Sequence, residues 1–336
     1  MKKQSNESAR FFDMLRFIAG SLGRGTKALF RRIFLGPKRP SWGIKMEGII
    51  GLQGGTYNLL SKIGPLRYHR AVEALIPRVV SGDATVEISE ADGLPGHWFV
   101  PEQPSDAVIL YFHGGGYVYG SVKTHGEMIG AIACSASAKT FALDYRLAPT
   151  HPQPAAIEDA CQAFHRLIEM GVPPERIVFA GDSAGGGLVI AAMLALREEG
   201  SPLPAAGVAI SPWVDLTCSD DSFDRNARYD SVTREACLVA ASAYLNGLPA
   251  DSPIVSPLFA SLDGLPPLLV HSGEVEVLHD QICSFAERAT SANVDVTLSV
   301  YPDMVHVWHM LVGFTPHAQA AIDEIGTFVK TQVTKA

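Results

Sequence analysis

Paired cysteines, metal-ligand clusters and long apolar runs are all scarce in this sequence. Its five cysteines are scattered, odd in number and without C-x-x-C spacing, so most of them are expected to be reduced core residues. Its eleven histidines are dispersed, with neither an H-E-x-x-H motif nor paired Cys/His spacing. The sequence therefore predicts no metal site.

Membrane-spanning and secretory signals are missing too. No apolar run approaches the length of a transmembrane helix. The stretch from Phe11 to Gly23 is apolar in part, but Asp13 and Arg16 interrupt it and no A-x-A-like cleavage site follows. The default expectation is a cytoplasmic protein.

Apolar residues are plentiful and charge is unevenly spread. Hydrophobic residues make up 47% of the chain and charged residues 18%, which supports a substantial core and excludes disorder for most of the chain. The net charge is −8, yet residues 1–45 hold eleven Lys and Arg against only Glu7 and Asp13. This basic segment is short and lacks any recognisable binding module, so nucleic acid is not an expected partner.

Residues 9–35 are expected to form two short basic amphipathic helices with Gly20, Gly23 and Gly25 between them. One interpretation is an element that contacts a membrane surface or acts as a lid. The alternative, which we favour, is a helix that packs its aromatic face onto the body of the protein. After the breaker at 36–40, a mostly helical pattern runs from Trp42 to Arg78.

From residue 84 onward, short β-runs alternate with helical stretches. Alternation of this kind predicts a mostly parallel sheet covered on both faces, here with a hairpin at its antiparallel edge. The strands are expected at 85–89, 97–100, 107–112, 139–143, 177–180, 207–210, 268–271 and 296–301, and the main helices at 122–136, 153–170, 184–199, 278–292 and 316–332. The interval 212–267 is too long for a simple crossover and is expected to join the N-terminal helices in a cap over the ligand crevice.

The segment 176–191 carries the most informative motif. A buried strand is followed by Gly181-Asp-Ser-Ala-Gly185 and then by an Ala/Leu-rich helix, which is the strand–turn–helix context of a G-x-S-x-G nucleophile elbow. The alternative is a glycine-rich turn with an incidental serine. A second motif, His113-Gly-Gly-Gly116, follows another strand, and its amides together with the N–H of Ala184 would form an oxyanion hole. The pairing favours catalysis, with Ser183 as the nucleophile.

These motifs together resemble those of the bacterial hormone-sensitive-lipase-like carboxylesterases, also called family IV, of the α/β-hydrolase superfamily. The matching stretches are His113–Tyr117, Asp144–Pro149, Gly181–Gly186, Ser211–Asp215 and the region of His306. The resemblance implies an α/β-hydrolase fold with an eight-stranded, mostly parallel sheet, helices on both faces and a helical cap. We expect residues 1–80 to form an N-terminal helical cap segment, 214–250 a cap insertion, and 81–213 with 251–336 the catalytic domain.

The resemblance also implies the roles of individual residues. Gly115, Gly116 and Ala184 would supply the oxyanion-hole amides. The chain order Ser, acid, His of this fold makes His306 the general base, with His309 as its rival.

The acid falls on Glu276 in the register of the family motif. The alternatives are Glu274 and Asp280, with Glu276 then a charge favoured by a helix N-terminus. Asp182 is expected to play a structural role, and Arg146 to pair with buried carboxylates. Candidates to line the acyl pocket are Tyr117, Val118, Tyr119, Trp213 and Leu216.

The predicted function is hydrolysis of short-chain carboxylic esters through an acyl-enzyme intermediate, with a small-molecule ester as substrate and no metal or cofactor. The same machinery would serve an amide, formamide or lactone hydrolase. A non-enzymatic receptor on this fold is expected to lack the base, whereas His306 is present. A further alternative is a membrane-associated lipase, and the basic N-terminal helices are the feature that suggests it. Relatives often pair through an exposed edge strand, which leaves a homodimer open.

Overall fold

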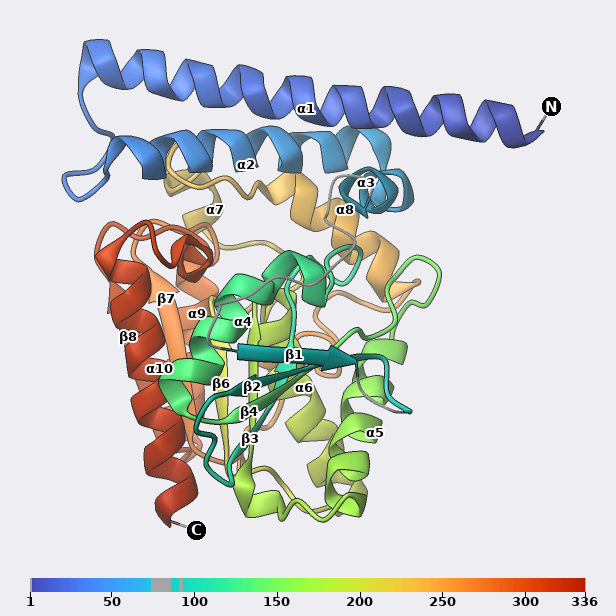
Figure 1. Cartoon of the computed structure of the whole chain (residues 1–336), viewed down its shortest axis with the longest axis vertical. Coiled ribbons are helices and arrows are strands. Elements are labelled where there is room, and N and C mark those ends of the chain that lie inside the picture. Colours follow the sequence, from blue (N-terminus) through green and yellow to red (C-terminus); the bar gives the residue numbers. More distant parts are fainter. Residues whose placement is uncertain (1, 74–85, 91–92, 336) are drawn as a thin grey trace.

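An eight-stranded sheet runs through the centre of the computed structural model, which describes residues 2–73, 86–90 and 93–335 (Figure 1). The strand order is β1-β2-β4-β3-β5-β6-β7-β8. β2 pairs antiparallel with both β1 and β4, and all other neighbours are parallel. The strands are β1 Val86–Glu90, β2 Gly96–Pro101, β3 Val108–Phe112, β4 Lys139–Leu143, β5 Ile177–Asp182, β6 Ala206–Ile210, β7 Leu268–Gly273 and β8 Val296–Tyr301. The predicted sheet, with its antiparallel hairpin at one edge, is confirmed.

Helices cover both faces of the sheet, as predicted. They are α4 Val122–Ala136, α5 Ala155–Glu169, α6 Ala184–Glu199, α9 His279–Ser291 and α10 Pro316–Lys335. α4 and α10 contact each other on one face, and α5, α6 and α9 lie on the other. The predicted bounds of α4 and α6 are the observed ones.

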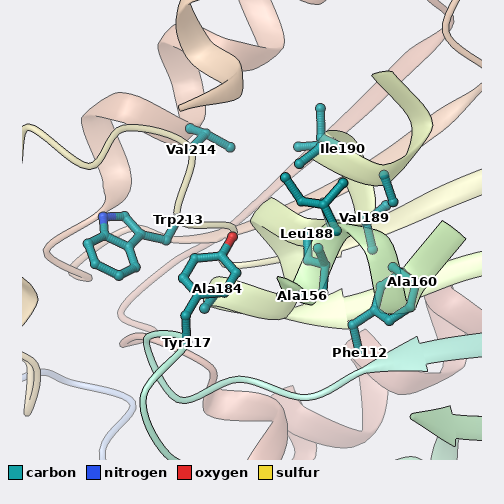
Figure 2. Close-up of a cluster of buried hydrophobic side chains, with 14 of the residues drawn as sticks. Phe112, Tyr117, Ala156, Ala160, Ala184, Leu188, Val189, Ile190, Trp213 and Val214 are labelled. Atoms are coloured by element: carbon teal, nitrogen blue, oxygen red, sulfur yellow. The ribbon is translucent and has the colours of Figure 1, made fainter. Parts of the chain in front are cut away.

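The inner strands are mostly apolar, and β3 is apolar and buried at every position, because both faces of the sheet are covered. On β3, Leu110 and Phe112 face the cluster that contains α5 and α6, whereas Ile109 and Tyr111 face α4 and α10. Figure 2 shows part of the first cluster, with Phe112 gathered beside side chains of α5 and α6. This two-sided packing fixes the carboxyl ends of the strands, from which the functional loops depart.

The N-terminal region corrects one prediction. Instead of two short helices, residues Lys2–Leu35 form a single helix, α1, which packs along α2 (Ile44–Ile63) (Figure 1). A Cβ on Gly25 would lie 2.8 Å from Leu52 Cδ2, and one on Gly51 would lie 2.8 Å from Ala28 Cβ. The glycines therefore do not break the helix. They allow the two helices to approach closely.

The expectation that an aromatic face packs onto the body is also wrong for the described part of α1. Phe30, Ile33 and Phe34 are 64%, 68% and 78% exposed, respectively. Small residues make the contact with α2, so these large side chains point to solvent.

Helices α3 (Pro65–Glu73) and α8 (Arg234–Leu245) pack with α1 and α2, and we refer to these four helices and the segment 226–233 before α8 as the cap. α3 follows α2, and α8 contacts both of these helices. As predicted, Thr233 caps α8, because its Oγ1 accepts the Ala236 N–H at 3.2 Å. A short helix, α7 (Ser222–Arg225), lies before α8. Parts of the predicted helical stretch and of the first strand, 74–78 and Thr85, lie outside the described residues, and the division into domains stays a prediction.

The segment between α1 and α2 is fixed to the loop that follows β8. Trp42 Nε1 donates to the backbone oxygen of Asp303 at 2.7 Å, and Arg39 forms an ion pair with the Asp303 carboxylate. Within the described ranges, no helix has an apolar stretch long enough to cross a bilayer.

Candidate active site

Ser183 occupies a strained turn between β5 and α6. Its φ of 56° and ψ of −119° are rare for a residue with a side chain. A Cβ on Gly185 would lie 2.0 Å from the carbonyl oxygen of Phe112, and one on Gly181 would lie 2.5 Å from the Gly185 oxygen. Only glycine fits at either position, so the motif residues are what allow strand and helix to meet at this serine.

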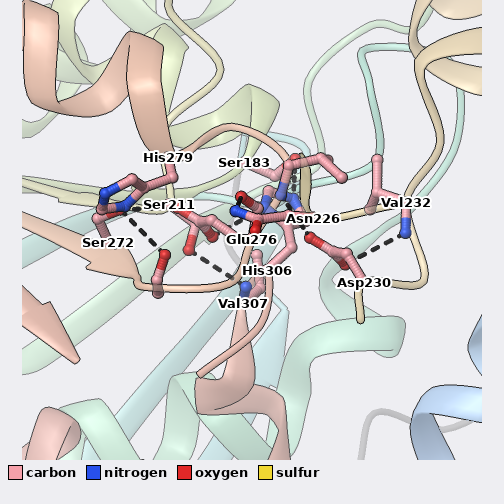
Figure 3. A network of polar contacts seen from close by, with 12 residues as sticks. Ser183, Ser211, Asn226, Asp230, Val232, Ser272, Glu276, His279, His306 and Val307 are labelled. Atoms are coloured by element: carbon pink, nitrogen blue, oxygen red, sulfur yellow. Dashed lines mark hydrogen bonds and ion pairs between the residues drawn. The ribbon is translucent and has the colours of Figure 1, made fainter. Parts of the chain in front are cut away.

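The structure brings the three predicted triad residues together (Figure 3). His306 Nε2 lies 2.9 Å from Ser183 Oγ, and His306 Nδ1 lies 3.3 Å from Glu276 Oε2. The side chain of Glu276 is fully buried. This geometry provides a hydroxyl, an imidazole able to take its proton, and a carboxylate that fixes the imidazole tautomer.

Further hydrogen bonds hold the loop that carries the acid (Figure 3). Ser272 Oγ donates to Glu276 Oε1 at 3.2 Å, and Asn226 Nδ2 donates to the backbone oxygen of Glu276 at 2.8 Å. The next backbone N–H, that of Val277, donates to Asp230 Oδ2 at 2.8 Å. Asn226 and Asp230 come from the loop between α7 and α8, and nothing local in the sequence indicated this supporting role.

The rival acids have other partners. Asp280 accepts the backbone N–H of Ser222 at 2.9 Å and forms an ion pair with Arg225. Glu274 pairs with Arg39 at 2.8 Å. Among the described contacts, neither carboxylate reaches His306, which favours Glu276.

The alternative base, His309, has a different partner in the structure. His309 Nε2 lies 2.9 Å from His271 Nδ1, and its ring is fully buried. Burial, together with the nearby charge of His271, holds the pKa of His309 well below its ordinary value. It is therefore a neutral core histidine.

The electrostatics of His306 combine opposing effects. Burial lowers its pKa, but the hydrogen bond and charge of Glu276, together with the charge of Asp230, raise it more, so the net pKa lies above the ordinary value. The carboxylates thus stabilise the imidazolium that forms during proton transfer.

The glycine loop is held beside the nucleophile by Asp182. This buried carboxylate accepts hydrogen bonds from Tyr111 Oη at 2.7 Å and from the Gly114 N–H at 3.0 Å, and it lies 3.4 Å from His125 Nε2. Burial raises the pKa of Asp182, but the charge and hydrogen bond of His125 and the Tyr111 hydrogen bond bring it below the ordinary value. This is the structural role expected for Asp182.

Gly115 and Gly116 follow directly, with φ values of 121° and 61°. A Cβ on Gly115 would lie 2.1 Å from the Tyr119 carbonyl oxygen, so this position requires glycine. α6 begins at Ala184, immediately after the nucleophile. The amide groups proposed for the oxyanion hole therefore belong to the two segments next to Ser183.

Comparison with known proteins agrees with this geometry. Residues 109–310 match the family of the α/β-hydrolase fold. An acetyl-hydrolase of Streptomyces hygroscopicus is 39% identical over 285 residues, which cover 81% of this chain and 95% of that protein. An esterase of Acinetobacter venetianus is 32% identical and covers 79% of this chain and 90% of its own length. The crystal structure of an esterase from the bacterial hormone-sensitive lipase family has a TM-score of 0.74 and 38% identity over 93% of this chain and 98% of that one.

The chain belongs to the hormone-sensitive-lipase-like carboxylesterases of the α/β-hydrolase superfamily. A second solved structure, an esterase/lipase from an uncultured bacterium, has a TM-score of 0.77 and 37% identity over 83% of this chain and 97% of that one. The esterase therefore has the predicted fold and the predicted class of reaction.

A narrow cavity opens beside Ser183. Its volume of about 30 Å³ corresponds to roughly two or three water molecules on the same measure. It is lined by Leu60, Gly116, Tyr119, Ser183, Trp213, Val232, Ala236, Cys237, Ala240, Leu278 and His306. Most of the apolar lining comes from α2, α8 and the residues just before α8, which are parts of the cap.

Only two of the five predicted pocket residues line this cavity, namely Tyr119 and Trp213. Tyr117 instead stacks on Tyr244, with ring centroids 4.0 Å apart. Val118 faces a different surface hollow, beside α3. Leu216 is fully buried in the main core. Tyr117 and Val118 do not line this cavity because the loop after the glycines turns successive side chains in different directions, and Leu216, which follows β6, packs in the core instead.

The expectation for Arg146 is also partly wrong. Its side chain pairs with Asp159 and Glu158, each within 2.9 Å. The side chain of Glu158 is 58% exposed. Glu158 is therefore not a buried carboxylate, whereas the side chain of Asp159 is only 12% exposed.

Proposed function

We propose that the esterase cleaves short-chain carboxylic esters through an acyl-enzyme, with Ser183 as nucleophile, His306 as general base and Glu276 as the orienting acid. The observation that carries the proposal is the continuous line of hydrogen bonds from Ser183 Oγ through His306 to Glu276. The same arrangement serves acyl transfer on unrelated folds.

In the first half of the reaction, Ser183 Oγ attacks the ester carbonyl while His306 Nε2 takes its proton. The imidazolium then protonates the departing alkoxide, and an acyl-serine ester remains. In the second half, water gives its proton to His306 and attacks the acyl-serine. Collapse of the second tetrahedral intermediate returns the proton to Ser183 Oγ and releases the carboxylic acid.

The N–H groups of Gly115, Gly116 and Ala184 are proposed to bind the oxyanion of each tetrahedral intermediate. Removal of one such donor typically costs about 3–4 kcal/mol of transition-state stabilisation. The Asp182 bond to the Gly114 N–H holds this loop in place before substrate arrives.

The size of the cavity supports the preference for short acyl chains. An acetyl or butyryl group fits a space of a few water molecules, whereas a long chain would have to displace the cap side chains that line it. A small-molecule ester is therefore the expected substrate. The cytoplasmic location and a homodimer stay predictions.

The test is a series of p-nitrophenyl esters from acetate to decanoate, with matching anilides, for wild type and Ser183→Ala. We expect kcat/KM to fall beyond butyrate and Ser183→Ala to lose roughly 10⁴-fold or more of the activity. Full activity in Ser183→Ala would exclude the mechanism. Faster cleavage of the anilides would assign the reaction to amides instead.

A further inference from the structure

A second and larger cavity lies between α1, α2 and the loop 227–230. Its volume is about 450 Å³, and among the described residues it shares no lining residue with the cavity at Ser183. Five of its lining side chains are basic, namely Arg24, Lys27, Arg31, Lys38 and Arg228. Its two acidic lining residues are Glu47 and Asp230.

Both carboxylates already have nearby donors. Glu47 Oε1 accepts the backbone N–H of Lys38 and lies 3.4 Å from Arg32 Nη1, outside the set of lining residues. Asp230 accepts the backbone N–H groups of Ser231, Val232 and Val277. The two carboxylates offset only part of the positive charge, because the lining holds five basic side chains.

The basic side chains lack such partners. Within the described part of the chain, none of the five forms an ion pair with a carboxylate. Lys38 Nζ donates to the backbone oxygen of Arg228 at 2.6 Å, and Arg31 Nη1 donates to that of Gly36 at 3.2 Å. Burial and the charge of Arg31 lower the pKa of Lys38 by more than the charge of Glu47 raises it, so the net pKa lies below the ordinary value. Cations gathered in one hollow repel each other, and an anion bound among them would relieve that repulsion.

We propose that this cavity binds a phosphate-bearing anion. Guanidinium groups match phosphate oxygens through paired N–H donors, and the two ammonium groups add charge. A ligand with two or more negative charges fits five cations better than a monocarboxylate does. The site is separate from Ser183, so the inference does not depend on the proposed ester hydrolysis.

The phosphate could come from a soluble compound or from the headgroup of an anionic lipid. The outer face of α1 bears on this choice, because Phe30, Ile33 and Phe34 are exposed on the same helix as Lys27 and Arg31. Apolar side chains beside basic ones are typical of helices that lie at a lipid surface.

The decisive experiment measures binding of inorganic pyrophosphate by calorimetry and of pure phosphatidylglycerol vesicles by co-sedimentation. The site variant is Arg24→Gln/Lys27→Gln/Arg31→Gln, since glutamine keeps helix propensity. The matched control, Lys123→Gln/Lys139→Gln/Lys330→Gln, changes net charge equally on other surfaces. Esterase activity of both variants checks that they fold. We expect the site variant to bind roughly tenfold or more weakly, and the control to bind like wild type.

Each outcome either supports or contradicts binding of a phosphate-bearing anion in this cavity. Site-dependent binding of pyrophosphate supports a soluble phosphate compound. Site-dependent binding of phosphatidylglycerol vesicles alone supports a lipid headgroup, and Phe30→Ser/Phe34→Ser should then weaken vesicle binding further. The proposal is overturned if wild type binds neither probe, if it binds phosphatidylcholine vesicles equally well, or if both triple variants lose affinity alike.

Discussion

Charged side chains have different surroundings in the catalytic body and in the basic cavity of the cap. In the body, Asp182 and Glu276 are buried, and hydrogen-bond donors surround each carboxylate. In the cap, five basic side chains line an open hollow and form no ion pair with a carboxylate of the described residues, and the catalytic cavity is bordered mainly by apolar side chains. The difference leads to the expectation that substitutions in the body change the rate of the reaction, and that substitutions in the cap change which ligands bind.

The largest expected effect tests the acid in the body. Glu276→Gln keeps the shape of the side chain but removes the charge that stabilises imidazolium, so kcat for p-nitrophenyl acetate should fall about 10³- to 10⁴-fold. Asp280→Asn is the matched control and should leave kcat within a few-fold, because Asp280 binds Ser222 and Arg225 instead. A larger loss in Asp280→Asn would move the acid to that residue.

The second prediction concerns the support beneath the glycine loop. Asp182→Asn should lower the free energy of unfolding by about 3–5 kcal/mol, because it breaks a buried pair with His125 and weakens two hydrogen bonds. The pKa of Asp182 is below its ordinary value, so its stabilisation is present above pH 3.8 and is lost as the pH falls through the folded value. Urea unfolding of both proteins at pH 7 and at a series of pH values below 3.8 measures this. A difference that stayed equal or grew as the pH fell below 3.8 would contradict the assignment.

These two predictions rest on residues that the sequence could identify. The motifs around Ser183 and His113 predict strand ends and tight turns that only glycine permits, and the structure has them there. The positions of the inner strands follow from nearly continuous apolar runs, which are typical of a sheet buried on both faces.

The cap was predicted less well, for physical reasons. The sequence predicts a break between two helices near Gly25, whereas this glycine allows a close contact with α2 that depends on tertiary packing. Leu60 and Ala240 line the catalytic cavity although they lie far from Ser183 along the chain. No local pattern marks such residues, because only the packing of α2 and α8 over the sheet brings them there.

The pH dependence of kcat/KM is expected to show a smaller effect of the residues in the catalytic body. His306 must be neutral to accept the serine proton, and its pKa lies above the ordinary 6.5. The acidic limb of kcat/KM should therefore have a midpoint above pH 6.5. In Glu276→Gln the midpoint should move to lower pH, because the hydrogen bond and charge that raise the pKa of His306 are gone. An unchanged midpoint would show that Glu276 does not influence the pKa of His306.

The smallest expected effect belongs to the cap. Leu60→Ala widens the catalytic cavity and should raise the kcat/KM ratio of p-nitrophenyl octanoate to butyrate by about fourfold for each methylene accommodated. Leu66→Ala, an exposed leucine on α3 outside that lining, is the control and should leave the ratio unchanged. Equal ratios in both variants would mean that α2 does not limit the acyl chain.

The bonds from Arg39 and Trp42 to Asp303 join the first turn of the cap to the loop that presents His306. Helix α2 starts at Ile44, beside this attachment, and Leu60 lies sixteen residues further along it, which is about 24 Å of helix. If α2 tilts about this attachment, the residues farthest from it move the most. A tilt of α2 about the attachment would thus displace Leu60 from the lining of the catalytic cavity, while the imidazole keeps its alignment with the serine.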